Sequence, residues 1–163
     1  MKAILLAGGF GTRLRPLTLN TPKPIVPLLD QPFIQHQIDL IRTIPDIDEI
    51  ILSLNYQPNV IEEVLRTACP GKPNIRYVCE PEPLGTGGAI RYAAGDTTST
   101  IVAFNGDVLS EINLEKMLAL HKTRNALATI ALTPVENPLA YGLVESETNG
   151  NISRFIEKPD PFD

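Results

Sequence analysis

Strand-length apolar runs alternate with helix-length amphipathic segments over the first 123 residues, and this alternation limits the fold more than any other feature. The runs of mainly apolar residues predict strands at 2–6, 49–54, 76–79 and 101–104. The segments between and after them predict helices at 32–43, 59–69, 85–94 and 114–123. Strands that alternate with helices are joined by crossovers and pair in parallel. We therefore expect a three-layer α/β fold around a mainly parallel sheet.

The last third of the chain has a different pattern, with strand-length runs that follow one another without helices between them. Its apolar runs predict strands at 126–133, 143–147 and 152–157, and Asn149-Gly150 is a typical hairpin turn between the last two. Hairpin strands are antiparallel, so the predicted sheet is mixed. With 163 residues and no linker or repeat, we expect a single domain over 1–163.

Composition excludes several classes of function. The chain is 43% hydrophobic and 20% charged, which is typical of a soluble globular protein, and its formal net charge is -5 at pH 7. An acidic chain is not expected to bind nucleic acid or an anionic membrane. The apolar run at 3–7 is too short for a signal peptide or a membrane span, so we expect a cytoplasmic protein. Cys69 and Cys79 lack metal-site spacing and are expected to be reduced thiols.

A glycine-rich loop directly follows the first predicted strand. Its sequence is Gly8-Gly9-Phe10-Gly11-Thr12-Arg13. Ligands of α/β sheets bind beyond the carboxyl ends of strands, and glycines let backbone N–H groups approach phosphate oxygens. The segment before Asp30 also carries four cations and no acidic residue. The loop matches neither the dinucleotide nor the Walker pattern. By itself it indicates a phosphate cradle or only a tight turn.

The residues from Gly8 to Pro24 follow the pattern GGxGTRLxPLTxxxPKP. Four more segments appear further along, Pro83–Ala89, Asn105–Asp107, Tyr141-Gly142 and Glu157–Pro159. In this order the motifs resemble the signature of the sugar-1-phosphate nucleotidyltransferases. The resemblance covers the whole chain. It implies the Rossmann-like nucleotide-diphospho-sugar transferase fold and transfer of a nucleotidyl group from a nucleoside triphosphate to a sugar 1-phosphate.

The resemblance also implies a role for individual residues. Three would be catalytic: Arg13 at the β and γ phosphates, Lys23 near the α phosphate, and Asp107 as a ligand of Mg²⁺. The nucleotide would be bound by Leu6, Ala7, Gly8, Gly9, Gly11, Thr12, Arg13, Glu80, Glu82, Gly85 and Thr86. The sugar phosphate would be bound by Gly142, Glu157 and Lys158. The alternative interpretation assigns no ligand to four of these residues. They would then be ordinary charged side chains on the surface: Lys23, Asp107, Glu157 and Lys158.

The nucleotide base can be argued from hydrogen bonding. A carboxylate accepts both N1–H and N2–H₂ of guanine, whereas thymine and uracil present one imide N–H. Glu80 or Glu82 therefore favours GTP, and the chain is most similar to the mannose-1-phosphate guanylyltransferase branch. A glucose-1-phosphate nucleotidyltransferase that uses dTTP, UTP or CTP is one alternative, and a non-catalytic nucleotide-binding regulatory module is another.

Members of the family carry a second metal carboxylate well downstream, and no position before Asp163 matches it. We therefore expect this chain to be the N-terminal part of the catalytic domain, able to bind nucleotide but poor in turnover. An uncovered sheet edge would favour pairing with another copy, so a homo-oligomer is also expected.

Overall fold

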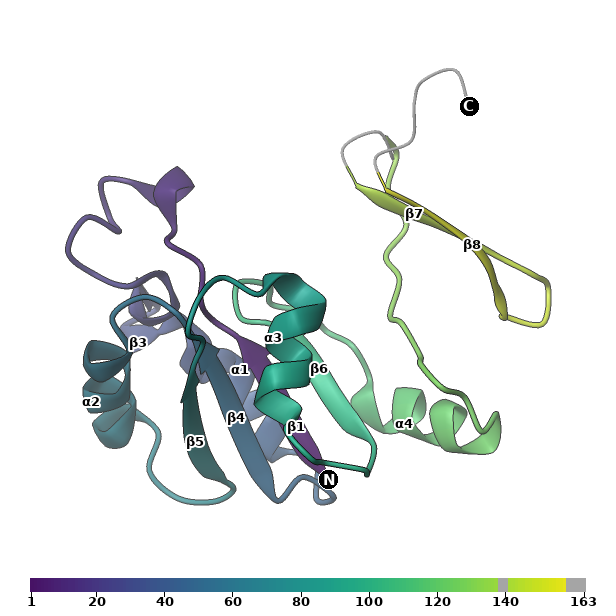
Figure 1. Ribbon diagram of the computed structural model, residues 1–163, viewed down its shortest axis with the longest axis horizontal. Helices are drawn as coiled ribbons and strands as arrows, with labels where there is room; N and C mark the ends of the chain where they lie inside the picture. The colour runs from purple at the N-terminus through teal and green to yellow at the C-terminus, as the bar shows by residue number, and fades with distance from the viewer. Residues whose placement is uncertain (138–140, 158–163) are drawn as a thin grey trace. The chain divides into compact units, whose positions relative to one another are not determined.

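The computed structural model describes residues 1–137 and 141–157, in two units, Met1–Glu111 and Ile112–Asp163. The first unit contains a four-stranded sheet (Figure 1). Its strands are β1 (Lys2–Leu6), β4 (Glu49–Leu54), β5 (Asn74–Cys79) and β6 (Ile101–Asn105), in the order β5-β4-β1-β6. All three pairings are parallel. The expected α/β class with a mainly parallel sheet is confirmed.

Three helices cross between these strands: α1 (Phe33–Arg42), α2 (Pro58–Ala68) and α3 (Gly85–Ala94). Each buries a stripe at helical spacing. In α1 the stripe includes Ile34, Ile38 and Ile41, all fully buried. Figure 1 shows α3 in front of the sheet and α1 behind it, which is the predicted three-layer arrangement. Among the described residues, no helix is both long and apolar enough to cross a membrane.

The core lies on both faces of the sheet because both are covered by helices. On the α3 face, Ile4 and Ile51 pack against Ala93. The alternate residues of the same strands, such as Leu5 and Leu52, point to the other face and are equally buried. Continuous apolar runs at 2–6 and 49–54 follow from this two-sided burial.

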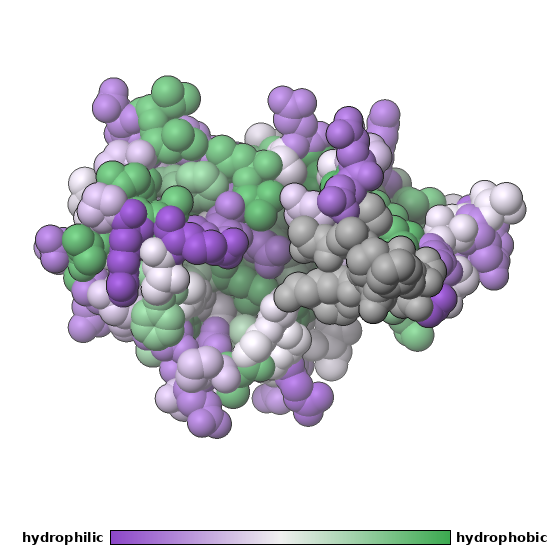
Figure 2. Space-filling view, turned by 90° about the horizontal axis from the view of Figure 1, so that it is seen from above, coloured by the Kyte–Doolittle hydropathy of each residue, from purple (hydrophilic) through white to green (hydrophobic). Residues whose placement is uncertain are grey.

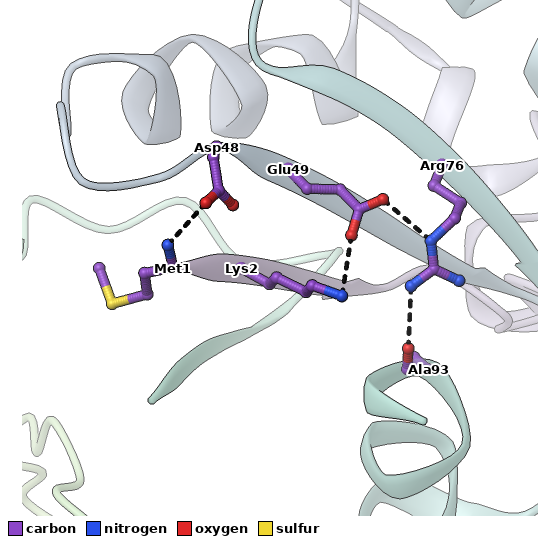
Figure 3. A network of polar contacts seen from close by, with 6 residues as sticks. All are labelled: Met1, Lys2, Asp48, Glu49, Arg76 and Ala93. Carbon is purple, nitrogen blue, oxygen red and sulfur yellow. Dashed lines mark hydrogen bonds and ion pairs between the residues drawn. The ribbon is translucent and has the colours of Figure 1, made fainter. Parts of the chain in front are cut away.

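A polar network joins the amino ends of the strands (Figure 3). The carboxylate of Glu49 accepts from Lys2 Nζ at 3.3 Å and Arg76 Nε at 3.0 Å, and so links β4 to both its neighbours. Arg76 also donates to the carbonyl of Ala93 in α3. The Met1 ammonium donates to Asp48, and this hydrogen bond lowers the pKa of the Asp48 carboxyl below its ordinary value of 3.8.

The long loop predicted after β1 contains short regular pieces. They are η1 (Thr12–Leu14), η2 (Lys23–Ile25), β2 (Pro27–Leu28) and β3 (Gln31–Pro32). β2 and β3 form an antiparallel hairpin whose two central residues, Leu29 and Asp30, both have positive φ. That is the geometry of a type I′ turn. The usual Asn-Gly or Asp-Gly signal is absent from this turn, so sequence patterns could not reveal it.

The second unit contains α4 (Leu114–Thr123) and the hairpin of β7 (Gly142–Ser146) and β8 (Ile152–Glu157). Asn113 caps α4 by accepting from Lys116 N–H at 2.9 Å, as its sequence position predicts. The antiparallel pairing of β7 with β8 and the turn at Asn149-Gly150 are confirmed. These two strands form a sheet of their own.

The predicted strand at 126–133 is wrong. This segment has no strand structure, and Leu127, Ile130 and Leu132 are at least half exposed. Its residues have the right preferences for a strand, but a strand exists only where a neighbour accepts and donates the ladder hydrogen bonds. The described parts of the chain provide no such neighbour for it.

Candidate nucleotide-binding site

A cleft of about 400 Å³ lies at the carboxyl ends of the strands, and we call it the switch-point cleft. From β1 the chain moves outward to β4 and β5, then returns to place β6 on the other side of β1. Loops that follow β1 and β6 therefore diverge, which is where α/β sheets bind ligands. The cleft is lined from all four strand ends, by Leu6–Phe10, Asn55, Glu80 and Asn105–Asp107, and by the start of α3.

The glycine loop forms one wall of the cleft. A Cβ on Gly8 would lie 3.2 Å from Asn55 Cβ, whereas a Cβ on Gly9 would meet nothing within 4 Å. The backbone at Gly9 is therefore open to a ligand. Gly11 has φ +66, and a Cβ there would lie 2.9 Å from Lys23 Cβ. Only glycine fits at position 11, and the loop wraps closely around Lys23.

Lys23 and Asp107 meet between the glycine loop and the end of β6. Lys23 Nζ lies 2.5 Å from Asp107 Oδ2, with the side chains 24% and 43% exposed. Pro22 and Pro24 flank the lysine in η2, and both are buried. The neighbour of Asp107 is equally constrained, because Gly106 N–H donates to Leu6 O at 2.8 Å and a Cβ there would lie 2.6 Å from that oxygen. The backbone beside each partner of the ion pair is thus constrained, by the buried prolines at Lys23 and by the contact of Gly106 with Leu6 at Asp107.

A second hollow of about 530 Å³ shares Lys23 and Asp107 with the cleft and adds Arg13; we call it the Arg13 hollow. Its other walls are apolar and include Leu17 and Phe33. Figure 2, which looks down on the carboxyl end of the sheet, shows hydrophobic and strongly hydrophilic residues side by side on that face. All three predicted catalytic residues therefore come together. However, Arg13 lines only the second hollow.

Glu80 is fixed at the edge of the switch-point cleft. Ser53 Oγ donates to its Oε1 at 2.9 Å, and Leu84 N–H donates to its Oε2 at 3.2 Å. Ser53 is fully buried in β4, so this anchor is rigid. Each oxygen keeps a lone pair for a ligand. Glu82 is exposed and does not line the cleft.

The N-terminus of α3 faces the same cleft through Gly85 and Thr86. No side chain caps this helix at Leu84. The first-turn N–H groups of a helix carry partial positive charge and favour an anion or a hydrogen-bond acceptor. Two other predicted nucleotide residues, Gly11 and Thr12, line neither hollow.

Sequence reasoning missed two parts of the cleft. Asn55 directly follows β4, and the rule that singled out Asp107 after β6 would have found it too. The second is Phe10, which lines the cleft and packs against Tyr56 outside it, with the ring centroids 5.3 Å apart. No local pattern connects residues of two different loops.

The predicted sugar-phosphate residues lie in the second unit. Gly142 and Glu157 are register partners at one end of the β7–β8 hairpin, so the structure brings these two positions together. Lys158 lies outside the described residues.

A parallel sheet with a glycine-lined cleft at its switch point is typical of α/β proteins that bind nucleotides. The chain belongs to the nucleotidyl transferase family, whose family model matches residues 2–163. Mannose-1-phosphate guanylyltransferase 1 of Arabidopsis thaliana is 42% identical over 98% of this chain, and mannose-1-phosphate guanylyltransferase of Mycobacterium tuberculosis is 40% identical over 96%. The chain spans 45% and 44% of those proteins, less than half their length.

A solved structure agrees with the sequence comparison. The crystal structure of HddC from Yersinia pseudotuberculosis complexed with GMP-PN superposes with a TM-score of 0.76. The two sequences are 28% identical, and the match covers 98% of this chain and 70% of that one. The fold and the family membership that the motifs predicted are thereby confirmed.

Proposed function

We propose that this chain binds GTP and serves guanylyl transfer from GTP to mannose 1-phosphate, giving GDP-mannose and pyrophosphate. The names of its 40–42% identical relatives support this activity. A related structure complexed with GMP-PN supports a guanine nucleotide in the cleft. One observation on this chain carries the proposal, the anchored carboxylate of Glu80.

Glu80 is suited to guanine because both its oxygens are held and both retain an acceptor site. Guanine presents N1–H and N2–H₂ side by side, and a fixed carboxylate can accept from both. Uracil and thymine offer a single N–H, so one oxygen would remain unpaired at the cleft edge. Of the two glutamates that the sequence offered, we propose that Glu80 binds the guanine base.

The chemistry requires alignment and charge neutralisation. An oxygen of the sugar phosphate attacks the α-phosphorus of GTP, a new P–O bond forms, and the bond to the β-phosphate oxygen breaks as pyrophosphate leaves with that electron pair. No protein nucleophile takes part. Lys23, shared by both hollows, would hold the α-phosphate, and Arg13 would hold the β and γ phosphates.

Asp107 fits a magnesium ion that arrives with the triphosphate. The described residues contain no group of three or more His, Cys, Asp or Glu that could hold a metal alone. Mg²⁺ commonly binds one or two carboxylates and takes its other ligands from phosphates and water, so a half-exposed Asp107 suits it. When bound, the ion would add positive charge at the phosphate oxygens. Lys23 contacts only Oδ2 of Asp107, so the carboxylate would have its other oxygen available for the ion.

Gly142, Glu157 and Lys158 are proposed to hold the sugar phosphate, as their motif positions imply. Cytoplasmic location and a homo-oligomer stay predictions from the sequence.

Isothermal titration of the 163-residue chain with GTP, dTTP, UTP, CTP and ATP in Mg²⁺ tests the proposal. We expect GTP to bind at least tenfold more tightly than the pyrimidine nucleotides. A preference for dTTP, UTP or CTP would favour the glucose-1-phosphate alternative, and equal affinities would remove the guanylyl assignment. Pyrophosphate release with mannose 1-phosphate, compared with glucose 1-phosphate, then distinguishes an enzyme from a nucleotide-binding regulatory module.

A further inference from the structure

Gln37 is a polar residue on the buried stripe of α1. Its side chain is only 4% exposed, between the fully buried Ile34 and Ile41. The amide nitrogen donates to the carbonyl of Asn105 at 2.8 Å and to the carbonyl of Val108. Both partners are acceptors only, so the nitrogen and not the oxygen must face them. These two carbonyls bracket Gly106 and Asp107.

The amide oxygen of Gln37 is buried and accepts no hydrogen bond from the described residues. Burying an unpaired carbonyl costs free energy, and leucine or methionine at this position would avoid that cost. The benefit of glutamine must therefore lie in the two bonds that it donates to the loop after β6.

Packing alone does not hold this loop. A cavity of about 130 Å³ lies beside it, lined by Gln37, Phe104, Val108 and Ser110 among others. On its other side the loop is held by the close contact of Gly106 with Leu6. Hydrogen bonds on both sides thus fix the backbone that carries Asp107.

We propose that Gln37 is a positioning residue that sets the orientation of Asp107 toward Lys23 and toward a nucleotide-bound divalent cation. The inference rests on the proposed metal role of Asp107. The amide holds the two carbonyls apart at a fixed spacing, and the Asp107 side chain leaves the backbone between them. Without the amide, the loop from Asn105 to Val108 opens toward the cavity, and the carboxylate loses its fixed direction.

The test compares Gln37→Met, which keeps the size but donates nothing, with Gln35→Met, a matched change at a half-buried position of the same helix. Amide hydrogen exchange of the ¹⁵N-labelled chain reports the loop directly. Gly106 and Val108 amides should exchange at least about tenfold faster in Q37M, with Ile51 in the central strand unchanged. If Q37M folds poorly, Gln37→Glu is the second variant. It has equal size but places an oxygen toward the two carbonyls, and it should give the same local change.

The second readout is Mn²⁺ affinity in the presence of GTP, followed by the electron paramagnetic resonance of the free ion. Q37M should weaken Mn²⁺ binding about threefold to tenfold, Q35M should not, and Q37M should add nothing in an Asp107→Asn background. Unchanged exchange at Gly106 and Val108, equal acceleration at Ile51, or additive effects of Q37M and D107N would overturn the proposal. If D107N alone leaves Mn²⁺ affinity unchanged, the metal role in the proposed function fails, and the exchange rates still decide whether Gln37 positions the loop.

Discussion

Lys23 and Asp107 are 84 residues apart in the sequence, and their side chains form an ion pair of 2.5 Å where the switch-point cleft meets the Arg13 hollow. Each side chain is at least partly exposed, so the pair is solvated and contributes little to stability. The pair matters for ligand binding, because it places a cation and an anion side by side. Together they suit a ligand that carries both negative and positive charge. A metal-bound triphosphate is such a ligand.

Separate roles for Arg13 and Lys23 can be measured with two nucleotides. Charged hydrogen bonds are worth roughly 1.5 to 3 kcal/mol, so losing one should weaken binding about tenfold to a hundredfold. Arg13→Ala should weaken GTP binding by this factor and leave GMP within about twofold, since GMP lacks the β and γ phosphates. Lys23→Ala should weaken both. Lys72→Ala, which removes an exposed lysine between α2 and β5, is the control for net charge. Equal losses of GMP in R13A and K23A would contradict the division of roles.

Base selection should depend on Glu80 and its anchor. Glu80→Gln replaces one acceptor by a donor and should erode the preference for GTP over UTP by on the order of 1 to 3 kcal/mol. Ser53→Ala should produce a smaller loss in the same direction, because Oε1 is then free to turn. Glu82→Gln is the matched control and should change nothing. Competition titrations with the two nucleotides measure the ratio, and an unchanged ratio in E80Q would remove Glu80 from the base site.

Gly106 should be intolerant of any side chain. A Cβ there would lie 2.6 Å from the carbonyl oxygen of Leu6, so Gly106→Ala must push β6 away from β1. We expect a loss of about 1 to 3 kcal/mol in the free energy of unfolding, measured with urea. Gly87→Ala has open space around it in α3 and should be neutral or stabilising by up to about 1 kcal/mol. Equal unfolding midpoints for the two variants would disprove the close contact.

The two cysteines should differ in reactivity. Burial raises the pKa of the Cys69 thiol from 9.0 to about 11, whereas Cys79 is exposed. At pH 8, iodoacetamide should label Cys79 in the native chain and Cys69 only after unfolding, as peptide mass spectrometry can determine. The unfolded thiol ionises at lower pH than the native one. Stability contributed by the neutral Cys69 is therefore present below pH 9 and lost as the pH rises toward 11. Rapid native labelling of Cys69 would contradict its burial.

Local patterns in the sequence predicted the elements whose apolar residues repeat on one face. The stripe of Ile34, Ile38 and Ile41 predicted α1, and the apolar run at 2–6 predicted β1. The segment 126–133 carries a comparable signal and forms no strand, because a ladder requires a partner and the sequence does not name one. Likewise, the turn at Leu29-Asp30 has no typical turn residue at its first position.

The candidate site was only partly predictable for a similar reason. Motifs identified Lys23 and Asp107 separately, but their contact depends on the packing of β6 against β1. Gln37 gave a signal that could have been read, since a glutamine falls on the apolar stripe of α1. Its partners, the carbonyls of Asn105 and Val108, are backbone atoms, and no side-chain pattern can reveal them.

The salt bridges of Glu49 at the amino end of the sheet help to fix the register of β4, on which the site at the other end depends. The register pairs Glu49 with Lys2 on one side and Asn74 on the other. Four residues further on, it pairs Ser53 with Leu6 and Val78. Because side chains alternate between faces, sliding β4 by one residue would turn Ser53 away and release Glu80. Glu49, about 13 Å from Ser53 at roughly 3.3 Å per residue, thus helps to keep Glu80, the proposed base-binding residue, in alignment.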